Sequence, residues 1–232
     1  MREIIFDTET TGLDPRSGHR LVEIGCIEMV DRRETGRSFH AYFHPERDMP
    51  MEAEAVHGLS ITFLSDKPRF AERAAELIEF LGDAPLVAHN AAFDFGFVNA
   101  ELARVGMAAL SFERMICTVQ MARKLHPGSK HSLDALCVRY GIDRSHRIKH
   151  GALLDAELLA HLYIEMTGGR QIGLGLAANM TGAAPTQSLR SDAALAARPF
   201  REPRPHAPSA SEQARHAEFV GQLNQPLWHD NV

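Results

Sequence analysis

The sequence predicts an α/β protein whose mixed sheet is covered by helices. Three strand-like segments joined by short links occupy residues 4–43 and indicate an antiparallel meander. Residues 85–167 then alternate a short buried strand with helices, a pattern that adds parallel strands to the meander. The 232 residues, 44% of them hydrophobic, are enough for one core followed by a tail.

The first strand ends in a pair of carboxylates. The apolar run Ile4-Ile5-Phe6 predicts a buried strand, and Asp7-Thr8-Glu9-Thr10-Thr11-Gly12-Leu13-Asp14 follows it. Because side chains alternate along a strand, Asp7 and Glu9 point to the same face, roughly 7 Å apart. A divalent cation neutralises such a pair best, whereas two solvated acids at an ordinary strand end are the alternative. Gly12 lets the backbone come close to a ligand.

Two more strands complete the meander. Residues 14–19 form a turn, and residues 21–30 form the second strand. Thr35-Gly36 predicts the hairpin turn, so that residues 38–43 pair as the third strand.

The later elements are marked by apolar spacing of three and four residues and by glycine stops. They are a loop over 45–50, a helix over 51–57 stopped by Gly58, an amphipathic helix over 69–81, a buried strand over 85–89, a helix capped by Asn90 and ended by Gly106, and helices over 117–125, 132–140 and 153–167.

Two more aspartates lie where helices begin in apolar company. Asp94 stands four residues after Asn90, which would place both on one helix face, and Asp155 lies one turn into the last helix. Either could simply be an acid that favours the positive end of a helix dipole. Together with Asp7 and Glu9, they could instead hold two Mg²⁺ or Mn²⁺ ions about 4 Å apart, as phosphoryl transfer requires.

One histidine stands near this set. His150 precedes Asp155 by five residues, in a polar loop over 144–151. A loop histidine is ordinarily a surface residue, and the chain has 13 histidines. A neutral imidazole beside metal ions could, however, take a proton from an attacking water at neutral pH.

The motifs in order carry a resemblance. Asp7-Thr8-Glu9-Thr10-Thr11-Gly12-Leu13, His89-Asn90-Ala91-Ala92-Phe93-Asp94 and His150-Gly151-Ala152-Leu153-Leu154-Asp155-Ala156 resemble the three motifs of the DEDDh family of 3′→5′ exonucleases. The similarity covers roughly residues 2–167 and is greatest to the proofreading epsilon subunits of bacterial DNA polymerase III.

This resemblance implies a ribonuclease H-like fold and stepwise 3′→5′ hydrolysis of DNA to nucleoside monophosphates. It further implies that two Mg²⁺ or Mn²⁺ ions are held by the four acids, with His150 as the general base. Glu52 and His57 fall where the family contacts the terminal nucleotide, and Asn90 is expected to help hold the scissile strand. The residues assigned to metal are Asp7, Glu9, Asp94 and Asp155, of which Asp7, Glu9 and Asp155 are also assigned to substrate.

The C-terminal part differs in composition. Six of the twelve prolines lie beyond Ala177, and residues 207–211 are typical of a flexible linker. The only tryptophan, Trp228, predicts docking on a partner, or packing of a tail helix on its own domain. The segment with Gln171, Leu174 and Leu176 resembles a sliding-clamp-binding peptide.

We therefore expect an exonuclease domain over 1–170, a clamp-binding peptide over 171–176, and a linker with a polymerase-docking tail over 177–232. The implied partners are the single-stranded 3′ end of DNA, an alpha-type polymerase subunit, a sliding clamp and a small theta-type subunit. A net charge of −5 argues against gripping nucleic acid by charge alone, but not against delivery by a partner.

Composition sets the remaining expectations. The three cysteines show no CxxC spacing and are expected to be reduced core residues. The sequence shows no signal peptide and no stretch long enough to span a membrane, so a cytoplasmic location is expected. Two alternatives stay open: an RNA-trimming exonuclease of the same fold, and a non-catalytic adaptor that only contacts the polymerase.

Overall fold

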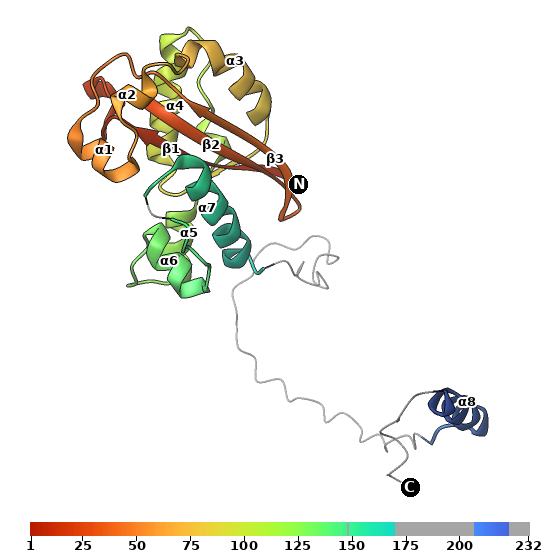
Figure 1. Cartoon of the computed structure of the whole chain (residues 1–232). Helices are drawn as coiled ribbons and strands as arrows, with labels where there is room; N and C mark the ends of the chain where they lie inside the picture. Colours follow the sequence, from red (N-terminus) through yellow and green to blue (C-terminus); the bar gives the residue numbers. More distant parts are fainter. Residues whose placement is uncertain (148, 170–206, 223–232) are drawn as a thin grey trace, which may run out of the picture. The chain divides into compact units, whose positions relative to one another are not determined.

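The computed structural model describes residues 1–147, 149–169 and 207–222, and backbone contacts divide the chain into two units, Met1–Ala177 and Ala178–Val232. The first unit is a five-stranded sheet with helices on both faces (Figure 1). Its strands are β1 (Arg2–Thr10), β2 (Leu21–Val30), β3 (Arg33–Tyr42), β4 (Leu86–Ala88) and β5 (Met115–Cys117). Its α-helices are α1 (Met51–His57), α2 (Ile61–Leu64), α3 (Phe70–Leu81), α4 (Ala92–Arg104), α5 (Thr118–Leu125), α6 (Leu133–Tyr140) and α7 (Ala152–Met166).

The sheet is mixed, as the sequence predicted. Its order is β3-β2-β1-β4-β5, with β2 antiparallel to β1 and β3, and with β4 parallel to β1 and β5. The central strand β1 therefore lies between the antiparallel and the parallel halves. Its C-terminal end, which carries the paired acids, is placed in the middle of the sheet.

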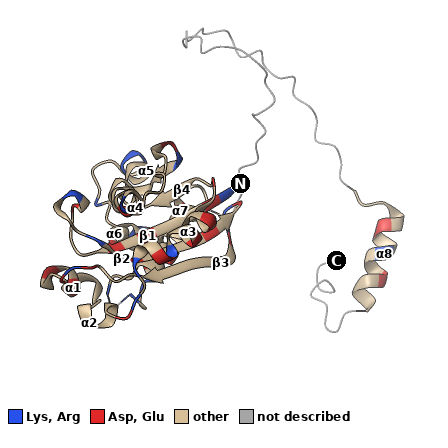
Figure 2. Cartoon of the chain, turned by 90° about the horizontal axis from the view of Figure 1, so that it is seen from above, with Lys and Arg blue, Asp and Glu red and all other residues tan. Residues whose placement is uncertain are grey.

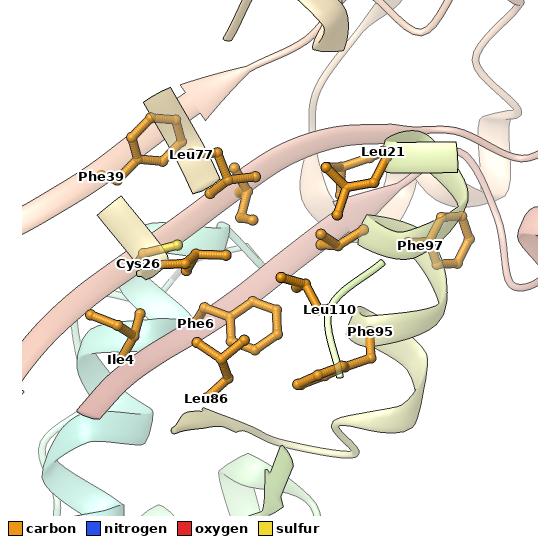
Figure 3. Packing of buried hydrophobic residues seen from close by; sticks show 14 of the residues in the cluster. Ile4, Phe6, Leu21, Cys26, Phe39, Leu77, Leu86, Phe95, Phe97 and Leu110 are labelled. Carbon is orange, nitrogen blue, oxygen red and sulfur yellow. The ribbon is translucent and has the colours of Figure 1, made fainter. Parts of the chain in front are cut away.

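Side-chain alternation along β1 divides the core into two layers. Ile4 and Phe6 pack with Phe95 of α4 and Leu77 of α3 on one face (Figure 3). Ile5 lies in a separate cluster with side chains of α5, α6 and α7 on the other face. An acid at an odd position near the end of β1 therefore points toward α7, and a side chain at an even position points toward α4.

The hairpin between β2 and β3 differs from the prediction. The turn lies at Asp31 and Arg32, whose φ angles are 50° and 62°, and not at Thr35-Gly36. Two positive φ angles give the type I′ turn whose twist matches the strands. Gly36, with φ at 81°, lies inside β3, where the pairing register shifts. The glycine thus serves a bulge rather than the turn.

The start of α4 also differs. Asn90 was expected to cap the helix, but the cap residue is Ala91, which makes no side-chain capping bond. Asn90 instead has a φ of 65°, a left-handed conformation that asparagine tolerates better than most residues. The chain needs this conformation because only three residues separate β4 from α4.

The other helices agree with the prediction to within one or two residues. Gly58 and Gly141 end α1 and α6 in left-handed conformations, as their C-caps. The short elements β5 and α2 were not predicted, because three or four residues show no periodicity. All three cysteines are free: Cys26 and Cys137 are buried, whereas Cys117 is half-buried at the end of β5.

The second unit contains the helix α8 (Ala210–Gly221). Ser209 and Glu212 form a capping box at its start, so Ala210 and Ser211 are helical rather than part of a linker. Gln171, Leu174, Leu176 and Trp228 lie outside the described residues.

Charges of both signs are interspersed along the elements of the first unit (Figure 2). In the part of the chain that the structure describes, none of the helices combines the length and the apolar character needed to cross a bilayer.

Candidate active site

Five carboxylates from four elements line one cavity of about 320 Å³ at the C-terminal end of β1, and four of them are the acids singled out in the sequence. Asp7 and Glu9 come from β1, Asp94 from the first turn of α4, and Asp155 from the first turn of α7. His150 also lines the cavity. The structure therefore brings together the four acids and the histidine that are separated by up to 148 residues in the sequence.

A glycine allows α7 to approach the acids. Gly25 of β2 is the register partner of Asp7, and it faces the start of α7. A Cβ atom built on Gly25 would lie 2.3 Å from the Cα of Leu153, which is far inside van der Waals contact. Any side chain at this position would push α7 away, so Gly25 sets the separation between Asp155 and the β1 acids.

Asp94 reaches the cavity from the opposite face of the sheet. The hydroxyl of Thr8, an even position of β1, donates a hydrogen bond of 2.7 Å to Asp94 Oδ1. Both residues are buried. This bond fixes the first turn of α4 to the end of the strand.

Three of the four acids are destabilised in their charged form. Burial raises the pKa of Asp7 well above its usual range, and the nearby charges of Asp94 and Glu9 raise it further. Burial, followed by the charge of Asp155, raises the pKa of Glu9 to about 8. Burial raises the pKa of Asp94 to about 7, although the Thr8 bond opposes it. These groups need an added positive charge to be ionised together.

Asp155 is the exception. Burial raises its pKa, but hydrogen bonds from His150 and Arg147 outweigh this and leave the pKa below its usual value. Arg147 Nε donates to Asp155 Oδ1 at 2.5 Å, and a terminal nitrogen of the same guanidinium donates to Oδ2 at 2.6 Å. Asp155 is therefore already paired with a cation.

His150 lies at the rim of the cavity, with its side chain about half exposed at 47%. Its backbone N–H donates to the carbonyl of Val56 at 3.4 Å, which joins its loop to α1. Its Nδ1 lies 3.2 Å from Asp155 Oδ2. One ligand atom each from Glu9, His150 and Asp155 lie within 4.8 Å of one another, a spacing compatible with holding a metal ion.

A second, larger cavity of about 600 Å³ lies beside the first, and both are lined by Thr8, Glu9 and Phe93. Glu52 and His57 line this second cavity. The His57 Nδ1 accepts the N–H of Leu59 at 3.0 Å, so its Nε2 carries the proton. That Nε2 is buried and, within the described ranges, has no hydrogen-bond partner.

Asn90 does not join these residues. Its side chain is exposed, and neither cavity has it among its lining residues. The left-handed turn described above directs the chain from β4 into α4, and it gives Asn90 a conformational role at that junction.

Sequence reasoning missed Gly25, Arg147 and Asp134. The guanidinium of Arg147 bridges Asp155 and Asp134, a residue in the first turn of α6. A signal was present, since a cluster of four acids demands a cation and Arg147 precedes His150 by three residues. No spacing rule could have revealed Gly25, because its role depends on the path of a helix 127 residues later.

The donor set fits a hard divalent cation. Carboxylate oxygens are the ligands that Mg²⁺ and Mn²⁺ prefer, and four of them converge here with an imidazole. The raised pKa values of Asp7, Glu9 and Asp94 show that the site lacks compensating positive charge. Added cations would supply it.

Comparison with known proteins agrees with this geometry. Residues 4–163 match the family model described as Exonuclease. The chain is 56% identical over 174 residues to the DNA polymerase III subunit epsilon of Rickettsia felis, covering 74% of this chain and 76% of that protein. It is 48% identical over 176 residues to the same subunit of Escherichia coli, covering 73% of this chain and 72% of that protein.

A solved structure of Exonuclease X in complex with 5′-overhanging duplex DNA has a similar fold. Its TM-score is 0.55 at 28% identity, and the match covers 71% of this chain and 90% of that one. The expected ribonuclease H-like architecture is thereby confirmed. The exonuclease family is dependent on divalent metal, as the acidic cavity indicates. The chain belongs to the exonuclease family and, within it, to the epsilon-type 3′→5′ exonuclease subunits of DNA polymerase III.

Proposed function

We propose that this chain removes mispaired 3′-terminal nucleotides from DNA as nucleoside monophosphates, with Asp7, Glu9, Asp94 and Asp155 holding two Mg²⁺ or Mn²⁺ ions. The observation that carries the proposal is the convergence of these four carboxylates on one 320 Å³ cavity. Bound there, two divalent ions would polarise the scissile phosphate and stabilise the attacking and leaving oxygens.

His150 is the proposed general base. We assign Nε2 as the atom that accepts the proton of the attacking water, which requires the tautomer whose Nδ1–H donates to Asp155 Oδ2, 3.2 Å away. Arg147, whose N–H faces Nδ1 at 2.8 Å, must turn away for this tautomer to form. Half exposure at the cavity rim lets the proton leave to solvent afterwards. Its attachment to the Val56 carbonyl keeps the loop beside α1.

The larger cavity is the proposed site of the terminal nucleotide. It shares Glu9 with the acidic cavity, so a nucleotide bound there would present its phosphate to the acids. The unpartnered Nε2–H of His57 is a buried donor that a nucleotide oxygen would satisfy. Glu52 offers an acceptor for a sugar hydroxyl at the same cavity.

Delivery by a polymerase accounts for the charge. A chain with a net charge of −5 binds phosphate weakly on its own. Tethering through residues 177–232 would raise the effective concentration to the order of millimolar. Within this proposal, Trp228 contacts an alpha-type polymerase subunit, Gln171, Leu174 and Leu176 contact a sliding clamp, and the complex works in the cytoplasm. A theta-type subunit is a further proposed partner.

The test is metal-dependent release of mononucleotides from a primer with a mispaired 3′ end, with and without the polymerase subunit. We expect release in Mg²⁺ or Mn²⁺, faster from the mispaired than from the paired end, and none in chelator. Matched single-stranded RNA serves as the competing substrate. A large preference for RNA would contradict the proposal and favour an RNA-trimming role. Absence of hydrolysis in Mn²⁺ would favour a non-catalytic adaptor.

A further inference from the structure

Among the described residues that line the acidic cavity, Arg147 is the only arginine or lysine. Its side chain is 8% exposed, so the charge is largely withdrawn from water. Nε and one terminal nitrogen of the guanidinium bind the two oxygens of Asp155, at 2.5 and 2.6 Å. The same terminal nitrogen lies 2.8 Å from His150 Nδ1. A cation thus holds the carboxylate that the proposed function assigns to metal.

The guanidinium also has a second acceptor. Its other terminal nitrogen donates to Asp134 Oδ1 at 2.9 Å. The Asp134 side chain is 45% exposed at the cavity rim and is also bound by Arg144. Rotation of Arg147 toward Asp134 would keep its charge paired while freeing both oxygens of Asp155. The two acids therefore offer Arg147 one position inside the cavity and one at its edge.

We propose that Arg147 is a positioning residue that neutralises Asp155 until metal binds and then transfers its pairing to Asp134. Arg147 and the metal compete for the same carboxylate oxygens. This inference rests on the proposed function, because it takes Asp155 to be a metal ligand. It assigns to Arg147 a role in the metal-free protein that none of the motif residues has.

Competition between Arg147 and the metal for Asp155 predicts the direction in which metal affinity changes when Arg147 is removed. Without the guanidinium, the acids of the metal-free cavity face no arginine or lysine among the described lining residues, whereas the metal-bound form obtains its positive charge from the ions. Removal of Arg147 should therefore destabilise the metal-free form more than the metal-bound form. By linkage, the metal must then bind more tightly, by about tenfold if the coupling is of ordinary size.

Removal of the second acceptor should have the opposite effect. In Asp134→Asn, Arg147 has no charged partner at the rim and stays on Asp155. Metal should then bind several-fold more weakly. A general loosening of the loop would weaken metal binding in both variants. Because Asp134 also lines the cavity, its lost charge alone could weaken binding, so Asp134→Asn is compared with and without Arg147→Gln: transfer predicts a larger loss of affinity when Arg147 is present.

The experiment uses the full chain and Mn²⁺ as the probe. Calorimetric titration gives the affinity, and thermal unfolding is recorded in chelator and in saturating Mn²⁺. The variants are Arg147→Gln, Arg147→Lys, which keeps the charge, Asp134→Asn, and Asp134→Asn combined with Arg147→Gln. Arg20→Gln is the matched control, because Arg20 forms a comparable buried pair with Glu101, at 2.6 Å, outside the cavity.

We expect Arg147→Gln to melt below the parent in chelator and close to it in Mn²⁺, and to bind Mn²⁺ about tenfold more tightly. Arg147→Lys should lie nearer the parent. Arg20→Gln should lose the same number of degrees in both conditions. Unchanged or weaker Mn²⁺ binding by Arg147→Gln would overturn the inference, as would an equal loss of melting temperature in both conditions.

If Arg147→Gln does not fold, Asp134→Asn is compared with and without Arg147→Lys: a larger loss of affinity when Arg147 is present supports the inference, and an equal loss or no loss overturns it. A parent chain that binds no Mn²⁺ would instead refute the proposed function itself.

Discussion

The two ends of the β1–β2 pair differ in whether their acids are paired with cations. At one end, Glu28 is 4% exposed and is bound by Arg2 Nε at 2.7 Å, by Arg37 at 3.0 Å and by the Thr35 hydroxyl at 2.8 Å. The hydrogen bond from Arg2 holds the pKa of Glu28 below its usual value.

At the other end of the pair, Glu9 is buried and Asp7 is half-buried beside the buried Asp94, and loss of hydration raises the pKa of all three. The difference separates stability from function. A buried acid that already has its cations contributes to the fold, whereas an unmatched cluster is maintained at a cost in stability and awaits charge from outside.

The largest effect is expected where the unmatched cluster loses a ligand. Asp7→Asn should lower the rate of hydrolysis of a single-stranded oligonucleotide by roughly 10³-fold or more. Mutation of residues that only hydrogen-bond to a metal ligand already lowers metal affinity or activity by about 10–100-fold. In chelator the same variant should melt above the parent, because the amide replaces a carboxyl group whose ionisation is opposed by burial and by the neighbouring acids. Oligonucleotide hydrolysis and thermal unfolding measure the two effects. If Asp7→Asn loses activity and also melts below the parent in chelator, Asp7 stabilises the fold as Glu28 does.

His150→Ala should have the next largest effect. Loss of a general base lowers the rate constant by roughly 10²–10⁴-fold. His146→Ala, in the same loop and exposed, is the control and should hydrolyse at the parental rate. Single-turnover hydrolysis at saturating Mg²⁺ makes the comparison. Equal rates for the two variants would remove His150 from the mechanism.

Glu28→Gln tests the end of the β1–β2 pair where the buried acid is already bound by arginines. We expect a loss of about 1–3 kcal/mol of unfolding free energy, since two arginines lose their charged acceptor. The melting temperature should fall by about 3–8 °C, equally in chelator and in Mg²⁺. Hydrolysis at 25 °C should be unchanged. A loss of melting temperature that Mg²⁺ reverses would contradict the division between the two ends.

The smallest effect is the pH dependence of the metal-free protein. Glu9, with a pKa of about 8, and Asp94, with a pKa of about 7, hold protons in the folded state that the unfolded chain releases near its ordinary pKa values of 4.5 and 3.8. Because the folded state binds more protons between these values, unfolding free energy should fall as pH rises from about 5 to 8.

We expect the melting temperature in chelator to fall by about 5 °C across this pH range, as the unfolding free energy decreases. Saturating Mg²⁺ should abolish the slope or reverse it, because bound metal favours the ionised carboxylates. The same downward slope in Mg²⁺ as in chelator would mean that the acids do not hold the ion.

Much of this arrangement was predictable. Alternation along a strand placed Asp7 and Glu9 on one face, and helical periodicity located α3, α4 and α7 to within a residue or two. The three motifs then indicated which aspartates would meet the β1 pair. The prediction of one shared cavity is confirmed by its lining residues.

What escaped prediction depends on contacts across the chain. The Asp31–Arg32 turn has no glycine, since the strand pairing imposes positive φ angles on two ordinary residues. The left-handed Asn90 is imposed by the short path from β4 to α4. Arg147 binds Asp155 and Asp134 through side chains whose meeting requires the packing of α6 against α7. Local sequence carries no record of such constraints.

Gly25 has a consequence beyond the protein itself. The Cβ of an alanine there would meet the Leu153 backbone, so α7 and its Asp155 would have to shift while the sheet retained its pairing. A cell carrying Gly25→Ala would make a folded chain with every catalytic side chain present, yet its replication errors would persist. Its mutation rate would rise because a single methyl group would occupy the space that Gly25 leaves for the start of α7.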